Sequence, residues 1–215
     1  MCWPSSRDFA TARDGGDRVP RAGLSRAAVT DIAVDLVDSS SDGFATLTLA
    51  AVAARAGVAV PSLYKHVGSL AELRRAVALV AMSELLRRSS AATVGVAGED
   101  ALRALGRELR AFASQHPGLY AATQVAPDLN DPAALALAQT AADTVVVVAA
   151  VLRGFGLPEA RTVDAVRATR AAIHGFIELE AHGGFGMPDD VDRSFEFLLD
   201  VLVTGVASWS TKGAQ

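Results

Sequence analysis

Cysteine is almost absent from this chain of 215 residues, in which Cys2 is the single one. One cysteine excludes an intramolecular disulfide and a metal site built from several thiolates. This composition is typical of proteins kept in a reducing compartment, so we expect a cytoplasmic location.

Long apolar runs are absent as well. The longest, VVVVAAVL, covers the 8 residues 145–152 and ends at Arg153, whereas a transmembrane helix needs about 20. Residues 1–23 carry four arginines but no apolar segment of the kind found in signal peptides. We therefore expect a soluble protein with no membrane partner.

Positive charge is scarce and unevenly placed. The chain has a net charge of −4, with +2 in residues 1–90 and −6 in residues 91–215. An acidic chain is a poor nonspecific ligand for nucleic acid, so contact with DNA would need a local basic group. Apolar residues make up 51% of the chain, enough for the core of one or two domains.

The apolar residues recur with helical spacing, and no alternating strand pattern is present. Residues 1–21 have no periodicity and many breakers, which predicts a flexible tail. The rest predicts an all-α fold of about nine helices. The expected helices start near residues 25, 49, 60, 69, 102, 132, 159 and 189, and the first has one apolar face formed by Val29, Ile32, Ala33, Leu36 and Val37.

Two short helices joined by a tight turn are predicted between residues 48 and 67. Thr48 is suited to capping the first helix, and Gly57 accepts the positive φ that the turn requires. Pro61 falls in the first turn of the second helix, where its missing N–H costs little. The pattern predicts a helix-turn-helix.

A capping box follows directly. Ser69 and Glu72 have the Ser-x-x-Glu spacing with which two side chains cover exposed backbone donors at a helix start. A long helix is therefore expected to run from Ser69 to about Ser90.

The segment LTLAAVAARAGVAVPSLYKHVGSLAELRRAV, residues 47–77, resembles the DNA-binding domain of the TetR family of bacterial transcriptional regulators. The glycine, the Leu-Tyr-x-His and the Ser-x-x-Glu-Leu all fall at the family spacing. The resemblance implies a DNA-binding domain at residues 22–82 and a dimerising, ligand-binding domain at residues 83–215.

The resemblance also implies roles for individual residues. Thr48, Tyr64, Lys65 and His66 would contact the sugar-phosphate backbone, and Val60, Pro61 and Ser62 would face base edges. The charge of residues 50–75 is +3, from Arg55, Lys65, Arg74 and Arg75 against Glu72.

Three positions depart from the family pattern. Ala59 stands where a capping serine or threonine is common, Val67 where phenylalanine is usual, and Leu70 where a lysine contacts phosphate. The hypothesis follows that tail arginines supply the missing contact; these are Arg13, Arg18 and Arg21.

The last helix is apolar around most of its circumference, apart from a polar stripe formed by Glu196, Asp200, Thr204 and Ser208. Such a helix must be buried on two sides. One interpretation is a homodimer interface made by Phe195, Leu198, Leu199, Leu202, Val206 and Trp209. The alternative is a central helix within a single subunit.

The segment RATRAAIHGFIELEAHGGFG, residues 167–186, resembles a C-terminal domain type named for its Trp-His-Gly signature, with Ile173 in place of the tryptophan. His174, Glu178 and His182 share a helix face, but the outer two are about 12 Å apart along the axis. We therefore expect no metal site there. A polar ladder of Arg170, His174 and Glu178 near the dimer interface and a role in a ligand pocket remain as alternatives.

A ligand pocket is predicted from an i+4 rhythm that crosses the sequence HPGLY. Its candidate residues are Phe112, His116, Tyr120 and Gln124, joined by His174 and Glu178. The alternative for each is a place in the core or at a helix cap.

No catalytic constellation is recognisable: there is no cysteine nucleophile outside the tail, no phosphate-binding loop and no convincing acid–base pair. We expect neither an enzyme nor a cofactor. The sequence predicts a homodimeric regulator, with repression as its expected mode, that binds a double-stranded DNA operator and responds to a small, mostly apolar molecule. The alternative is a helical interaction protein whose helix-turn-helix serves packing only.

Overall fold

The computed structural model describes residues 24–39 and 42–212, with side chains described through Trp209. The predicted tail and its arginines lie outside these residues. The described residues form ten α-helices and one 3₁₀ turn, without a strand, which confirms the all-α class. The described residues hold two more α-helices than the eight starts expected from the sequence, because α2 and α7 are short and fall in segments that the sequence indicates as connections.

The N-terminal part packs four helices around a small core. Val29, Ala33 and Val37 of the first helix are fully buried, as the apolar spacing predicted, and the Oγ of Ser25 caps this helix by accepting from the N–H of Ala28 at 3.1 Å. The four helices are α1 (Arg26–Asp38), α2 (Gly43–Thr46), α3 (Leu49–Ala56) and α4 (Val60–Leu63).

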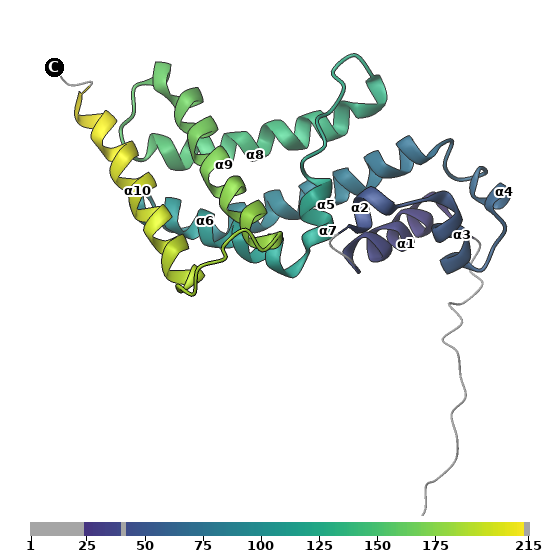
Figure 1. The fold of residues 1–215 in the computed structure, drawn as a ribbon. Coiled ribbons are helices and arrows are strands. Elements are labelled where there is room, and N and C mark those ends of the chain that lie inside the picture. The colour runs from purple at the N-terminus through teal and green to yellow at the C-terminus, as the bar shows by residue number, and fades with distance from the viewer. Residues whose placement is uncertain (1–23, 40–41, 213–215) are drawn as a thin grey trace, which may run out of the picture.

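The longest helix, α5 (Leu70–Thr93), belongs to both halves of the molecule (Figure 1). Its first turns bury Leu73 and Val77 in the core shared with α1, and its later turns bury Met82 and Leu85. The domain boundary expected at residue 82 therefore lies inside an unbroken helix.

The remaining helices surround the second half of α5. They are α6 (Gly98–Gln115), α7 (Pro117–Ala122), η1 (Pro132–Ala134), α8 (Leu135–Arg153), α9 (Glu159–Ala181) and α10 (Val191–Lys212). Helix α8 lies lengthwise beside α5, and α9 and α10 form the end of the molecule farthest from α3 and α4 (Figure 1).

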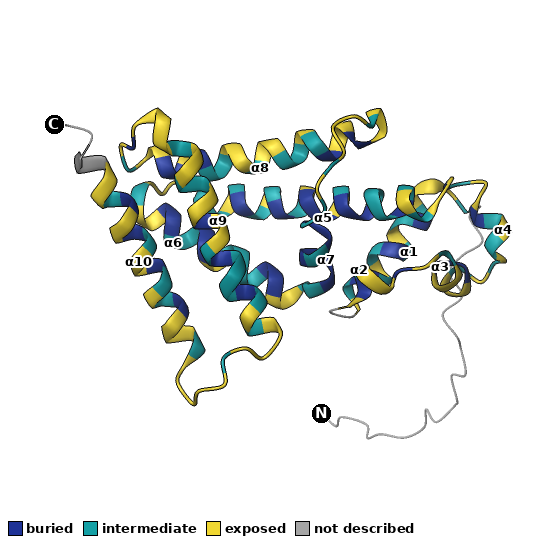
Figure 2. Ribbon diagram, turned by 45° about the horizontal axis from the view of Figure 1, so that its top comes forward, coloured by how far each residue is buried: buried dark blue, intermediate teal, exposed yellow. Residues whose placement is uncertain are grey.

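One continuous buried cluster joins the two halves. It extends from Val29 and Val52 in the N-terminal helices, through Val77 of α5, to Tyr120 of α7 and Ile173 of α9. Buried segments occur in both halves of the molecule (Figure 2). A second, smaller cluster around Leu102, Leu152 and Val203 holds α6, α8 and α10 together.

Helix α7 begins where the sequence HPG suggested only a break. Pro117 occupies its first turn, where a proline is tolerated, and the N–H of Tyr120 donates to the carbonyl of His116 at 2.8 Å. His116 thus ends α6 and starts α7.

Ion pairs fix α6 against α9 and α10. Arg107 donates to both carboxylate oxygens of Glu196, at 2.8 and 2.7 Å, and Arg103 pairs with Asp200. Arg110 pairs with Glu180 and Asp192 and lies over the ring of Phe195. Half of the polar stripe of α10 thus faces α6.

The segment Pro132–Arg153, which forms η1 and α8, is long and apolar enough by composition to cross a membrane. In the structure it packs along α5. Leu137 and Leu152 are buried in the two core clusters, whereas Leu135, Val145 and Val146 of the same helix are exposed.

Candidate DNA-binding surface and ligand cavity

The turn between α3 and α4 has the geometry that the sequence predicted. The Oγ1 of Thr48 caps α3 by accepting from the N–H of Ala51 at 3.1 Å. Gly57 has φ +68°, and the N–H of Val58 then donates to the carbonyl of Ala53 at 3.0 Å. Ala53 is buried at the crossing, where a larger side chain would separate the helices.

The second helix of the motif, α4, is a single turn. Ala59 supplies no side-chain cap, and the N–H groups of both His66 and Val67 donate to the carbonyl of Leu63, at 2.8 and 2.9 Å. Because these bonds tighten the chain after Leu63, Tyr64, Lys65 and His66 project from a turn, not from a continuing helix.

The surface formed by this motif exposes the predicted DNA contacts. Tyr64 is 57% exposed, Lys65, Pro61 and Thr48 are exposed, and Ser62, Val60 and His66 are partly so. Leu63 and Val67 are buried beneath them, so the smaller Val67 still fills its place.

The capping box at the start of α5 is present. The N–H of Glu72 donates to Ser69 Oγ at 3.1 Å, and Glu72 Oε2 accepts from the N–H of Gly68 at 2.8 Å. The other oxygen of Glu72 pairs with Arg26 at 2.8 Å. Leu70 is partly buried and packs against the core.

Two arginines that the sequence placed in the basic group are engaged elsewhere. Arg74 donates to the carbonyls of Ala45 and Leu47 at 2.9 and 3.2 Å, and Arg75 pairs with Asp131 at 2.8 Å. Arg75 is paired with a carboxylate and Arg74 is held by backbone carbonyls just before α3, so the local charge of +3 overstates the number of cations free to contact phosphate from this surface. Arg55 and Lys65, both exposed, remain there.

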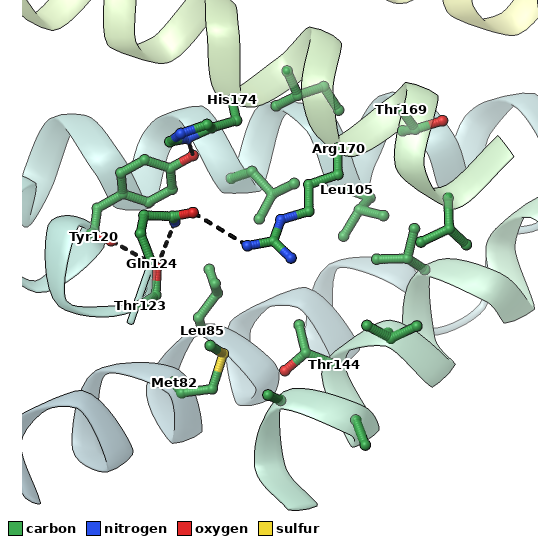
Figure 3. A pocket seen from close by; sticks show the side chains of 17 residues that line it. Met82, Leu85, Leu105, Tyr120, Thr123, Gln124, Thr144, Thr169, Arg170 and His174 are labelled. Atoms are coloured by element: carbon green, nitrogen blue, oxygen red, sulfur yellow. Dashed lines mark hydrogen bonds between the residues drawn. The ribbon is translucent and has the colours of Figure 1, made fainter. Parts of the chain in front are cut away.

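A cavity of about 260 Å³ lies between α5, α6, α7, α8 and α9 (Figure 3). Its wall is mostly apolar, and its polar side chains come chiefly from α7, the residues directly after α7, and α9. Residues that define it are Met82, Leu85, Leu105, Tyr120, Gln124 and Arg170.

Hydrogen bonds join the polar groups at one side of this cavity (Figure 3). The Tyr120 hydroxyl lies 2.9 Å from Nδ1 of His174, and Gln124 Nε2 donates to Thr123 Oγ1 at 2.8 Å. Burial, and secondarily the charge of Glu178, raise the pKa of Tyr120 above its ordinary value. The phenol therefore stays neutral and keeps its proton for hydrogen bonding.

The structure brings only half of the predicted pocket residues to the cavity. Tyr120, Gln124 and His174 line it. Phe112 is fully buried in the core, because the helix axis changes at His116 and the i+4 rhythm does not continue across that break. His116 itself contacts Asp38 of α1.

Glu178 lies outside the cavity, where its carboxylate oxygens are 3.9 Å from Nδ1 of His174 and 3.8 Å from Nδ1 of His182. The predicted polar ladder of Arg170, His174 and Glu178 is interrupted between its first two members. Arg170 donates to Gln124 Oε1 at 3.3 Å and not to His174. Sequence analysis missed Arg170 as a cavity residue, although its i−4 spacing from His174 places it on the same face.

The structure divides the residues predicted for the dimer interface into buried and exposed ones. Phe195, Leu199 and Val206 are buried within their own chain, so the interface prediction rests on the other three. Leu198 and Leu202 are partly exposed, and Trp209 is 47% exposed. Phe197 and Val201, 68% and 50% exposed, are the outward apolar residues that the prediction omitted.

Comparison with known proteins agrees with this arrangement. Residues 40–77 match the family described as bacterial regulatory proteins of the tetR family, and residues 102–202 match the tetracyclin repressor-like C-terminal domain. The HTH-type transcriptional regulator Rv0681 of Mycobacterium tuberculosis is 34% identical over 182 residues, which is 84% of this chain and 80% of that protein. The chain belongs to the TetR family. It is a DNA-binding transcriptional regulator.

Other similar proteins cover most of the chain. The HTH-type transcriptional regulator YobS of Bacillus subtilis is 26% identical over 87% of this chain and 95% of its own length. The crystal structure of BioQ from Mycobacterium smegmatis has a TM-score of 0.62 and 26% identity, over 86% of this chain and 99% of that one. A structure of BioQ with its double-stranded DNA operator matches with a TM-score of 0.59 and 25% identity, over 86% and 99%.

Proposed function

We propose that this protein is a homodimeric repressor that binds a near-palindromic operator and is released by a small molecule in the cavity of each subunit. The observation that carries the proposal is the exposed surface of α3, α4 and the following turn, held by Gly57 and Thr48. BioQ, which is 25% identical, forms a complex with its DNA operator, and this supports the same use of the motif here.

The exposed side chains divide into two groups by chemistry. Thr48, Tyr64, Lys65 and His66 carry donors suited to phosphate oxygens, which fix position on the duplex. Val60, Pro61 and Ser62 form the single turn of α4 and would face base edges in the major groove.

Dimerisation is proposed through the outward faces of α9 and α10. Helices α9 and α10 lie at the end of the molecule away from the DNA-binding motif (Figure 1). Phe197 and Val201 of α10 are large apolar residues that are exposed to solvent. The exposed ring of Trp209 adds to this face, with the guanidinium of Arg161 lying 4.7 Å from its centroid. Two copies joined there would present two motifs to half-sites about 34–36 Å apart.

Release by ligand is proposed to act through α5 and α7. Helix α5 lines the cavity with Met82 and Leu85 and packs on α1 with Leu73 and Val77. The ligand would have to bind more tightly to a helix arrangement that binds DNA poorly than to one that binds DNA well. The ratio of these two affinities limits how far it can weaken DNA binding.

The test is selection of binding sites from a random DNA library with the purified protein. We expect enrichment of one near-palindrome, whose binding weakens steeply as salt rises because counterions are released at each neutralised phosphate. Failure to enrich any sequence, with a folded dimer in hand, would contradict the proposal.

A further inference from the structure

The charge of the cavity wall points to a chemical class of ligand. We infer that the cavity binds a small amphipathic monocarboxylate whose carboxylate is held by Arg170. This rests on the proposed function in that it takes the same cavity as the ligand site.

Arg170 is the one permanently charged side chain of the cavity lining, and no aspartate or glutamate is among the lining residues. Its guanidinium points into the space between Gln124 and Thr144 (Figure 3). In the described part of the chain, no carboxylate lies within 4 Å of it, since it forms none of the ion pairs there.

Several other arginines of the same domain are paired with carboxylates, although Arg153, Arg161 and Arg167 form none of the ion pairs in the described residues. Arg88 pairs with Glu108, Arg103 with Asp200, and Arg107 with Glu196. Arg170 instead donates to a neutral amide oxygen, Gln124 Oε1, at 3.3 Å, beyond the usual range for such a bond. A guanidinium has five N–H donors in a planar fork that fits a carboxylate with two parallel bonds, so most of its capacity is unused.

The rest of the wall fits an apolar body. Leu85, Leu105, Leu109, Val148, Val166 and Ile173 all line the cavity. The Tyr120 hydroxyl and His174 Nδ1 bond to each other, so they need no ligand atom to satisfy them. At about 260 Å³ the cavity lies just below the range of about 300–1,000 Å³ typical of sites for drug-sized molecules, and the ligand must be small.

The position of Arg170 sets the orientation. The residue is exposed, so the charged head of the ligand would lie at the mouth and retain contact with water. This arrangement avoids the large cost of burying an ionised carboxylate. Because the lining holds one cation and no acid, a ligand amine would find no counter-ion there. A second carboxylate on the ligand would likewise have no cation to pair with, so the lining favours a monocarboxylate.

Isothermal titration calorimetry on the full chain tests the inference with matched pairs of probes. The acids are hexanoate, octanoate, decanoate, benzoate and phenylacetate, each compared with its primary amide, and octylamine is the cationic probe. We expect at least one acid to bind about 10-fold or more tightly than its amide, because hydrogen bonds to charged groups are among the stronger ones. Binding of no acid, or of amides and octylamine equally well, would overturn the inference.

Three variants identify the residue responsible. Arg170→Met keeps an unbranched, flexible apolar stem and removes the charged guanidinium, and it should reduce the preference for acid over amide to about 2-fold or less. Gln124→Glu places a competing carboxylate beside Arg170 and should also weaken binding of acids, with little effect on amides. Arg167→Met removes an exposed arginine of the same helix outside the cavity lining and serves as the matched control. Retention of the full preference in both Arg170→Met and Gln124→Glu would overturn the inference.

DNA binding is measured separately, with the operator from the selection experiment. If acids bind through Arg170 but do not release the operator, the proposed ligand class is supported and ligand-controlled repression is contradicted. If the protein binds its operator but prefers none of the acids over the matching amide, the proposed repression is supported and the proposed ligand class is contradicted.

Discussion

The imidazole Nδ1 of His116 lies 2.8 Å from Oδ2 of Asp38. Asp38 is the last residue of α1 and His116 immediately precedes α7, so this contact joins the DNA-binding helices to a helix of the cavity wall. The other oxygen, Asp38 Oδ1, is buried and finds no hydrogen-bond partner within the described residues.

The first prediction concerns this contact. Asp38→Ala and His116→Ala should each lower the free energy of unfolding by about 1 kcal/mol, and the double variant by less than the sum, because each single change removes the same contact. Urea denaturation measures the cycle. Asp35→Ala, at an exposed position of α1, is the control and should change stability by less than about 0.5 kcal/mol. Strict additivity would show that the pair does not interact.

A second prediction compares two glycines. Gly57→Ala should destabilise the protein by about 1 kcal/mol, because φ +68° is unfavourable for a residue with a Cβ. Gly175→Ala should be neutral or stabilise by up to about 1 kcal/mol, since Gly175 lies within α9 and an added Cβ meets nothing within 4 Å. Equal effects in thermal unfolding would refute this account of the turn.

The third prediction separates phosphate contacts from base contacts. Lys65→Ala should weaken binding to all sequences alike and reduce the salt slope by about 1, and Tyr64→Phe should weaken it alike through loss of the hydroxyl. Ser62→Ala should change sequence preference instead. Fluorescence anisotropy on matched and mismatched operators gives both readouts. Arg153→Ala, an exposed cation at the end of α8, is the control. A change of preference in Lys65→Ala would reverse the assignment.

The fourth prediction concerns the proposed dimer. Val201→Glu should shift the protein toward monomer in sedimentation velocity, because an unpaired carboxylate within an apolar interface is costly. Val146→Glu, which places the same charge at a similarly exposed valine of α8, should leave the dimer intact. Dissociation by the α8 variant alone would move the interface to α8.

The fifth prediction concerns acid. A hydrogen bond from Arg107 holds the pKa of Glu196 below its ordinary value of about 4.3. The stabilisation by this pair is therefore present above about pH 5 and is lost as the pH falls through the lowered pKa. Glu196 is substantially exposed, so the effect is at most about 1 kcal/mol.

Glu196→Gln should accordingly flatten the fall in unfolding free energy between about pH 5 and pH 3. The difference from the unchanged protein should shrink in 1 M salt, which screens exposed charges. A steeper fall in the variant would contradict this assignment.

The helix-turn-helix could be predicted because its determinants are local. Thr48, Gly57 and Ser69 act on backbone groups within a few residues of themselves, so their spacing alone carries the information. The partners of Arg74 and Arg75 lie 27 to 56 residues away, and no local pattern indicates them.

The cavity and the outer face of α10 were only partly predictable. Tyr120 and His174 were singled out, but their contact across 54 residues emerges only when α7 is laid against α9. For α10, the sequence shows two apolar faces without showing which one the chain itself covers. Phe195 and Phe197 are the same residue type two positions apart in one helix, yet the first is buried and the second is exposed.

The buried apolar cluster that runs from Val29 to Ile177 is continuous between the two halves. Unfolding of the DNA-binding helices would expose part of the surface on which the cavity helices rest, so the two halves should melt as one cooperative unit in calorimetry. Filling the cavity would then slow amide hydrogen exchange in α1 as well as in α9, so that occupancy is readable at Val29, which does not line the cavity.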